Sequence, residues 1–393
     1  MSRRVYRIPG IRNKNPLSFL LAPDSFKDSL AASEVCAAMK RGVLQAMPGA
    51  RLLSLPLSDG GEGFVDAMLF AKGGEKVFVK VTGPLGEPVR AFYGLTGAEH
   101  EIAVLEMAAA SGLQYVPLRL RNPLKTTTFG TGELILHALD RSVRTLIIGI
   151  GGSATHDVAC GAAQALGARF SDADGRVVDQ KMSGAILQKI YHVDLSYMTS
   201  RLNDVNIQVA CDVNNPLLGP LGAAKTYARQ KGADERQIEI LESGTRHIID
   251  LIESAAGQRV REIPGSGAAG GMGAGFMAFM GATLQPGIRI LLKNSDIERQ
   301  IRGIDYILTG EGCTDSQTLH GKTVQGIVET AEKYEIPVII MSGQIKNAKL
   351  FVNRVHSMVS LSRQAGSTGR SLERPAFWIE KTAEKITRDI MAG

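Results

Sequence analysis

Short apolar runs and longer stretches of helical periodicity alternate along almost the whole chain. The apolar runs, one of them alternating with polar residues, predict strands near residues 19–22, 51–57, 76–81, 102–107, 145–150, 207–211, 304–309, 337–341 and 357–361. Apolar residues spaced three and four apart predict helices near 33–47, 64–71, 131–139, 157–166, 234–254, 268–281 and 323–334, and a last one ending at about 390. This alternation is typical of α/β proteins with parallel sheets.

Two clusters of turn residues divide the alternation, one at 82–86 and one at Pro286-Gly287. A chain of 393 residues is also longer than one average domain. We therefore expect one discontinuous α/β domain, built from residues 18–85 plus 288–393, and a second α/β domain inserted at 86–287.

Charge and cysteine spacing argue against several classes of protein. The net charge of +6 depends on five basic residues within an acid-free segment, 1–17, which we expect to be a disordered basic extension. No basic and aromatic residues interleave elsewhere, so nucleic-acid binding is not expected. No stretch is long and apolar enough to predict a membrane helix. The four cysteines lie far apart, which favours reduced thiols and a cytoplasmic protein.

Glycines and acidic residues cluster three times, each time directly after a predicted strand. The clusters are Asp59-Gly60-Gly61-Glu62-Gly63, Gly151-Gly152-Ser153-Ala154-Thr155, and Gly310-Glu311-Gly312 running on to Asp315, Gln317 and Gly321-Lys322. The carboxyl ends of parallel strands form a ligand-binding crevice, and glycine lets the backbone approach an anion closely. The clusters therefore predict an enzyme that acts on small anionic molecules.

Three further positions are candidates with two readings each. Asp24-Ser25-Phe26-Lys27 follows the first strand, either as a helix cap with a surface lysine or as part of the site. Asp212 follows the strand near 207–211, either as a ligand-binding carboxylate or as the start of a turn. Glu106 stands in an apolar setting, either as a hydrogen-bonded core acid or as a ligand contact.

Two glycine motifs resemble nucleotide-binding motifs but lack the neighbouring residues or elements that such motifs require. Gly265-Ser266-Gly267-Ala268-Ala269-Gly270 has no strand before it and no acidic residue at the ribose position, so it does not predict a NAD site. We interpret it as a helix start, including Gly270 and Gly271, that lets a phosphate or another backbone come close. Gly321-Lys322-Thr323 lacks the first glycine of a P-loop, because position 316 is serine.

The three glycine and acid clusters, in this order along the chain, resemble motifs of the bacterial glycerate kinase family. The resemblance covers the chain from about Ser18 onward. Further matching segments are 22–27, 106–113, 130–135, 210–213, 230–233 and 264–273. The resemblance implies ATP-dependent phosphorylation of D-glycerate at its 2-hydroxyl, with Mg²⁺. It also implies two α/β domains, one Rossmann- or flavodoxin-like and one like restriction endonucleases, with the active site in the cleft between them. ATP and D-glycerate are the expected partners. A homodimer is a possible assembly.

Within that resemblance, phosphoryl transfer mainly needs positioning and neutralisation of phosphate charge. Lys27 and Lys322 are expected to supply positive charge, and Asp212 and Asp315 to hold Mg²⁺ or accept the hydroxyl proton, with their roles left open. The residues expected to bind substrate or phosphate are Asp24, Ser25, Gly60, Gly61, Glu62, Glu106, Gly151, Gly152, Ser153, Thr155, Gly270, Gly271, Glu311 and Gln317.

The sequence departs from the family's usual residues at several motifs. His156, Val158 and Ala159 replace an asparagine and two glycines after the Gly151–Thr155 loop; Cys313 replaces an arginine, and Val324 and Arg229 replace prolines. A histidine there is expected to titrate near neutrality beside the anion-binding loop. The departures leave two alternatives to an active glycerate kinase: a weakened paralogue that binds a hydroxy acid or nucleotide, or a kinase for a related sugar acid.

Overall fold

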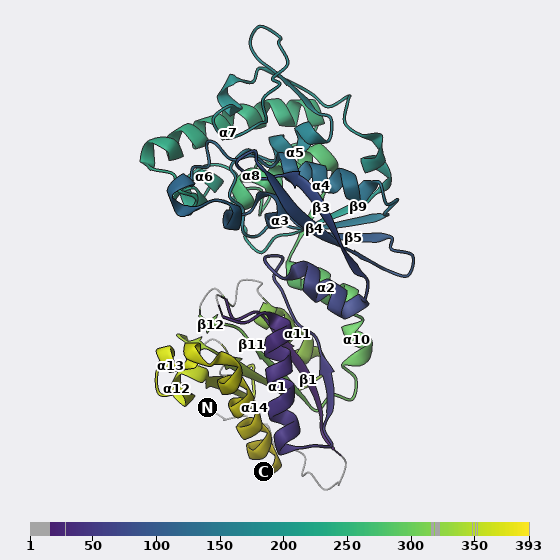
Figure 1. Ribbon diagram of the computed structural model, residues 1–393, viewed down its shortest axis with the longest axis vertical. Coiled ribbons are helices and arrows are strands. Elements are labelled where there is room, and N and C mark those ends of the chain that lie inside the picture. The colour runs from purple at the N-terminus through teal and green to yellow at the C-terminus, as the bar shows by residue number, and fades with distance from the viewer. Residues whose placement is uncertain are drawn as a thin grey trace.

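The computed structural model describes residues 16–27, 29–315, 318, 323–347, 349, 351 and 353–392. Figure 1 shows two lobes, and the N-terminal and C-terminal parts of the chain lie together in one of them. Each lobe contains one main sheet. No helix in the described ranges is long and apolar enough to cross a membrane.

The five-stranded sheet of the first lobe is entirely parallel. Its strands, in spatial order, are β15 (Ser357–Ser360), β13 (Val338–Ser342), β11 (Tyr306–Gly310), β1 (Ser18–Pro23) and β2 (Arg51–Ser54). Counted within the sheet, this is the doubly wound order 2-1-3-4-5, in which ligands bind where the order reverses. That reversal lies between β1 and β11.

The six-stranded sheet of the second lobe is mixed. Its spatial order is β10 (Thr283–Gln285), β9 (Asn206–Ala210), β6 (Thr145–Gly149), β5 (Ile102–Glu106), β4 (Pro88–Thr96) and β3 (Glu75–Thr82). Strands β10, β9, β6 and β5 are parallel, whereas β4 pairs antiparallel with both β5 and β3. The predicted crossing at 82–86 forms part of the hairpin turn between β3 and β4. The chain instead first passes between the sheets at 55–63, because β3 is a strand of the second sheet.

Helices cover both faces of the first sheet. One face packs against α1 (Ala32–Ala46) and α14 (Pro375–Ala392), through side chains such as Phe19, Leu21 and Leu308. The other face packs against α11 (Thr323–Lys333) through Leu20 and Ile307, because successive residues of a strand point to opposite faces. Near the sheet edge lie α12 (Leu361–Gln364), α13 (Thr368–Glu373) and the short strands β12 (Cys313–Thr314) and β14 (Gln344–Ile345).

The outer face of the second sheet is covered by the remaining helices, which enclose the largest apolar core. They are α3 (Ala108–Ser111), α4 (Phe129–Leu139), α5 (Cys160–Ala165), α6 (Ala223–Tyr227), α7 (Glu235–Ala256) and α8 (Ala268–Met280). Short 3₁₀ turns are η1 (Leu113–Tyr115), η2 (Leu118–Leu120), η3 (Leu187–Lys189), η4 (Ser200–Asp204) and η5 (Arg229–Lys231), and β7 (Arg169–Ser171) pairs with β8 (His192–Asp194).

A layer of helices between the two sheets packs against both of them. It contains α2 (Phe64–Lys72), α9 (Gly287–Asn294) and α10 (Ile297–Gln300), and Figure 1 shows α2 between the lobes. We call the apolar cluster around this layer the shared core; its buried members include Leu20, Ala22, Phe64, Met68, Val104, Ile147, Ala210, Ile288, Leu291, Ile307 and Ile327. The two sheets are therefore joined by a continuous hydrophobic interior.

Candidate active site

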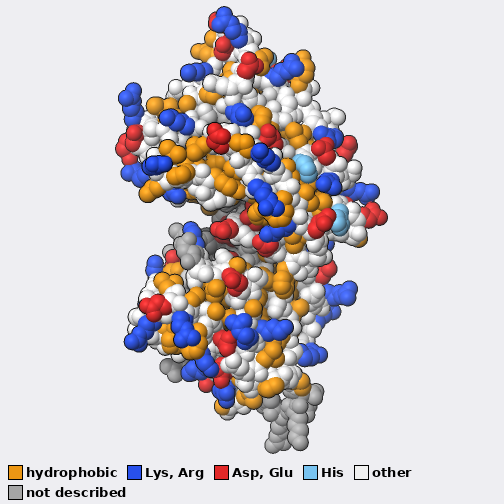
Figure 2. All heavy atoms as spheres, viewed as in Figure 1, with side chains coloured by type: hydrophobic (Ala, Val, Ile, Leu, Met, Phe, Trp, Pro, Cys, Tyr) orange, Lys and Arg blue, Asp and Glu red, His pale blue; other side chains and the backbone are white. Residues whose placement is uncertain are grey.

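The predicted glycine and acid clusters converge at the carboxyl ends of parallel strands from both sheets. Asp24 N donates to Gly310 O (2.8 Å), so the segments after β1 and β11 lie side by side. In the second sheet, Ile150 N lies 3.4 Å from Ala210 O, which joins the segments after β6 and β9. Figure 2 shows the surface hollowed between the lobes, with acidic side chains near its rims.

The loop 59–63 runs between the two sheets and touches the ends of β6 and β9 and the start of α9. Gly60 has a φ of +93°, and a Cβ on it would lie 2.6 Å from the Cβ of Ala210. A Cβ on Gly149 would lie 2.3 Å from Gly60 O, and one on Gly287 would lie 2.3 Å from Asp59 O. Glycine is therefore required by backbone conformation at Gly60 and by close approach at all three positions.

Three carboxylates gather where the first sheet reverses its strand order. Asp24 Oδ1 accepts from Ser25 N (2.6 Å), and its Oδ2 accepts from the Thr323 hydroxyl at the start of α11. Burial of this carboxylate, together with the charges of Asp59 and Glu311, raises the pKa of Asp24 to about 7. Asp59 was not among the predicted site residues, although it begins the Asp59–Gly63 motif.

Threonine hydroxyls hold the Glu311 carboxylate in place. Its Oε1 accepts from the hydroxyls of Thr318 (2.7 Å) and Thr314 (3.1 Å). The Thr318 hydroxyl also accepts from Asp315 N (3.1 Å), so the loop after β11 is tied to itself. The fixed loop brings Glu311 and Asp315 to the same strand end.

The other predicted residues of this edge lie nearby. Asp212 Oδ1 accepts from Gly287 N (3.0 Å), which places Asp212 beside the Asp59–Gly60 backbone. Lys27 is exposed, and its backbone N would lie 3.4 Å from a Cβ on Gly312. Glu62 is exposed on the 59–63 loop. Gln317 and Lys322 lie outside the described residues.

The Gly151–Thr155 loop is braced by its neighbours, with Gly152 at a φ of +75°. Ala154 N donates to Ser111 O (3.0 Å), and Leu113 N donates to Gly152 O (3.0 Å). A Cβ on Gly270 would lie 2.3 Å from Thr155 O, so the glycine-rich start of α8 lets another backbone come close. Gly270 therefore lets the start of α8 contact the end of this loop, whereas Gly271 lies close to Leu217 and Val158.

Lys231 is a buried residue beneath this loop that was absent from the predicted site. Its side chain is only 2% exposed, and Nζ donates to Ser153 Oγ and to Thr155 O, both at 2.7 Å. Burial lowers the pKa of Lys231 to about 7, although the charge of Asp157 opposes the shift. The Gln230–Ala233 segment was part of the family resemblance and could have indicated it.

The expectation that His156 titrates near neutrality is wrong, because this side chain is fully buried. Its Nε2 lies 3.0 Å from the Thr245 hydroxyl of α7, and burial, with Lys231 nearby, lowers the pKa of His156 to about 3. Val158 and Ala159 have φ values of +54° and +59°, the left-handed region that glycine favours. Val158 and Ala159, which stand where the family usually has glycine, therefore carry backbone strain of about 1–2 kcal/mol each.

Glu106 caps a helix of the shared layer. Its Oε1 accepts from Val65 N (2.8 Å) in the first turn of α2, and the side chain is 5% exposed. Burial raises the pKa of Glu106 to about 7. Of the two predicted roles for Glu106, a hydrogen-bonded core acid or a ligand contact, this geometry corresponds to the first.

We expect Glu106→Gln to change the free energy of unfolding by less than about 1 kcal/mol, because the amide keeps an acceptor for Val65 N. Glu106→Ala removes the acceptor and is expected to cost about 1–3 kcal/mol, the penalty of an unsatisfied buried donor. Urea unfolding of both variants at pH 4, where the raised pKa keeps Glu106 uncharged in the folded protein, measures the hydrogen bond by itself. A large fall in kcat/KM for Glu106→Gln at unchanged stability would instead assign Glu106 to ligand binding.

The chain is similar to several known proteins along almost its whole length. The family model described as the glycerate kinase family matches residues 19–391. A glycerate kinase of Bacillus subtilis is 43% identical over 95% of this chain and 98% of its own length. A glycerate 2-kinase of Escherichia coli is 46% identical over 84% of this chain and 86% of its own. A crystal structure ascribed to glycerate kinase 2 of Salmonella typhimurium has a TM-score of 0.85 at 43% identity, covering 96% of this chain and 99% of that one.

Proposed function

Because this chain belongs to the glycerate kinase family and is an ATP-dependent glycerate kinase, we propose that the converging strand ends are its active site, where the γ-phosphate of ATP is transferred to the 2-hydroxyl of D-glycerate. The observation that carries this assignment is the meeting of acidic residues from both sheets around the 59–63 loop. Phosphoryl transfer needs such a site, because positioning and charge stabilisation supply most of the catalysis.

Proton acceptance is the first task of these carboxylates. A general base works best when its pKa lies near the operating pH, and burial and neighbouring charges give Asp24 a pKa of about 7. Asp24 therefore joins Asp212 and Asp315 as a candidate to accept the proton of the substrate hydroxyl. Lys27 and, beyond the described residues, Lys322 are proposed to neutralise phosphate charge.

Magnesium binding is the second task. Among the residues that the structure describes, no three His, Cys, Asp or Glu side chains form a metal site. Mg²⁺ commonly takes only one or two carboxylates and completes its shell with water and substrate phosphates. The oxygen-rich donor set fits this ion, and a cation would relieve the repulsion from Asp59 and Glu311 that adds to burial in raising the pKa of Asp24. We propose Asp212 and Asp315 as its ligands; the bound ion would neutralise phosphate charge.

The remaining substrate contacts stay predictions. Ser25, Gly60, Gly61 and the exposed Glu62 lie at the edge where the two sheets meet, and Gly151, Gly152, Ser153 and Thr155 lie after β6. Two N–H groups of that second loop, from Gly151 and Ala154, already donate within the protein. We therefore propose that side chains contribute more to anion binding there than the sequence suggested. The cytoplasmic location and a homodimer also stay predictions.

We further propose that each main sheet is the core of one α/β domain. The strand order of the first sheet supports a flavodoxin-like domain built from both ends of the chain. The strand pairing supports a first boundary at 55–63 in place of 85/86, and a second near Pro286-Gly287. The likeness of the inserted domain to restriction endonucleases stays a prediction.

A coupled ADP-release assay with ATP, Mg²⁺ and a panel of hydroxy acids tests the proposal. D-Glycerate is expected to give the highest kcat/KM, and ³¹P NMR is expected to show a phosphate ester on the 2-position. ADP release with another sugar acid but not with glycerate would overturn the substrate assignment. A 3-phosphate product would overturn the position.

A further inference from the structure

We infer that Lys231 is a positioning residue that aims the hydroxyl of Ser153 at an anionic oxygen of a bound substrate. The inference rests on the proposed function, since it places the Gly151–Thr155 loop in the substrate site. The chemical class of the recognised group is an anionic oxygen, either the carboxylate of the hydroxy acid or a phosphate of the nucleotide.

The hydrogen bonds around Ser153 fix the direction of its proton. Lys231 Nζ donates to Ser153 Oγ (2.7 Å) and to Thr155 O (2.7 Å), and below its lowered pKa of about 7 the ammonium form can only donate. The Ser153 proton must therefore point away from Lys231, where it can be donated to another acceptor. Because the donor is charged, it polarises the hydroxyl and strengthens such a bond.

In the described part of the chain, no carboxylate forms an ion pair or a hydrogen bond with Lys231 Nζ, whose two acceptors are uncharged. The charge of Asp157 acts on Lys231. The Asp157 carboxylate itself, however, accepts from Thr128 N (2.8 Å), Thr128 Oγ1 (2.8 Å) and Gly161 N (3.3 Å). The buried His156 is neutral above its lowered pKa of about 3. A buried charge without a partner is costly to the folded protein. A bound anion one hydroxyl away would offset part of that cost.

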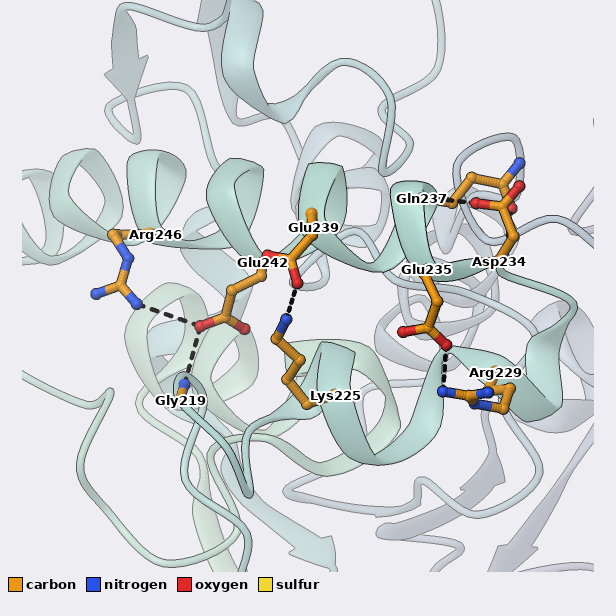
Figure 3. Close-up of polar contacts among 9 residues, drawn as sticks. All are labelled: Gly219, Lys225, Arg229, Asp234, Glu235, Gln237, Glu239, Glu242 and Arg246. Atoms are coloured by element: carbon orange, nitrogen blue, oxygen red, sulfur yellow. Dashed lines mark hydrogen bonds and ion pairs between the residues drawn. The ribbon is translucent and has the colours of Figure 1, made fainter.

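The segment just before Lys231 contacts α7, as Figure 3 shows for Lys225 and Arg229. Arg229 pairs with Glu235 in the first turn of α7, and Lys225 of α6 pairs with Glu239 one turn later. Asp234 and Gln237 close a capping box at the same end, with bonds of 2.8 and 3.0 Å. The buried cluster of Ala224, Ala228, Ala233, Ile238 and Leu241 packs this segment against α7, so that the lysine can serve as a fixed support.

The test compares Ser153→Ala, Lys231→Met and the double variant of the full chain, with the exposed Lys189→Met as the control. We measure kcat, KM for D-glycerate, KM for ATP and Tm at pH 6, where Lys231 is charged. Each single substitution is expected to raise the KM of the same one substrate by about tenfold or more, the loss typical of a hydrogen bond to a charged group. The other KM is expected to stay within about twofold. A raised glycerate KM identifies the carboxylate as the recognised group, and a raised ATP KM identifies a nucleotide phosphate.

The double variant shows whether the two residues act as one unit. If they do, the KM of the double variant is expected to match that of the single variant with the higher KM. If the two residues act independently, the fold-increases in KM of the single variants multiply. Multiplied effects, or unchanged KM values in a folded Ser153→Ala variant, would overturn the inference. Ser153→Ala stays decisive if Lys231→Met does not fold. If the parent protein does not phosphorylate glycerate, the proposed function fails, and calorimetric binding of glycerate and of ATP to parent and variants then tests the inference by itself.

Discussion

Replacing Asp24 by asparagine is expected to lower kcat by about 100-fold or more and, at the same time, to stabilise the folded protein at pH 8. The catalytic loss is typical of removing a general base. The gain in stability follows from burial and from the repulsion by Asp59 and Glu311, which disfavour the charged form of Asp24 in the folded state. An amide carries no charge, yet it can still accept from Ser25 N.

The pH dependence of this gain follows from the direction of the shift. The pKa of Asp24 rises from 3.8 to about 7 on folding, so the folded state holds this proton more tightly than the unfolded state. Its contribution to stability therefore falls as the pH rises from about 4 to about 7, and stays low above that. Asparagine removes this dependence. The gain is expected to be about 1–3 kcal/mol at pH 8, since each pKa unit is worth about 1.4 kcal/mol, and to vanish near pH 4.

Urea unfolding between pH 4 and pH 8 in EDTA, together with kcat at saturating substrates, measures both effects. The exposed Asp204→Asn is the control for a general loss of negative charge. Asp212→Asn and Asp315→Asn are expected to lower kcat to a similar degree, because they are the proposed magnesium ligands. A kcat for Asp24→Asn within a few-fold of the parent value would remove Asp24 from the chemistry. A loss of stability at pH 8 would contradict the electrostatic account.

Replacing Gly60 by alanine is expected to lower both stability and activity, whereas Gly63→Ala in the same loop should be mild. Both residues have positive φ values, +93° and +86°, so both substitutions carry strain of about 1–2 kcal/mol. Only Gly60 adds a clash, because its new Cβ would lie 2.6 Å from the Cβ of Ala210, while nothing lies within 4 Å at Gly63. Overpacking of this kind adds about 1–3 kcal/mol.

The same clash is expected to move Asp59 away from Asp24, so that kcat/KM falls at least about tenfold in Gly60→Ala, because small misplacements at a reacting centre are costly. Urea unfolding and initial rates of the two variants, measured side by side, separate clash from strain. Equal losses in both would mean that φ strain alone is responsible and that close approach to β9 is unimportant.

Hydrophobic periodicity predicted most of the regular elements, since buried strands such as β1 and amphipathic helices such as α7 carry their pattern locally. The helix α9 was missed because Pro286-Gly287 was interpreted only as a break, although proline is common at helix starts. The hairpin of β3 and β4 was read as a domain crossing because its turn at 82–86 contains glycine and proline. Which sheet a strand joins depends on distant partners, and no local pattern records them.

The candidate site was predictable where its residues follow strands, as Asp24, Asp212 and Glu311 do, because parallel strand ends meet at one edge. Asp59 also follows a strand, but the glycines of its motif indicated only a close backbone approach and gave no separate signal for this carboxylate. Lys231 could not be placed from the residues alone, since lysine is rarely buried and nothing near it in sequence shows that Ser153 lies above it. His156 was misjudged for the same reason: burial, which a sequence does not state, decides its protonation.

The shared core limits how this enzyme can be divided. Helices α2 and α9 bury apolar side chains against both sheets at once, so neither lobe can leave the other without exposing them to water. Heat or denaturant should therefore melt the two lobes together, as a single cooperative unit. A fragment containing only one lobe would expose the apolar side chains that the shared core buries, and an exposed apolar surface of that kind favours aggregation. Because separating the sheets would open this shared core, we expect substrate capture to depend on loop movement more than on rigid swinging of one lobe against the other.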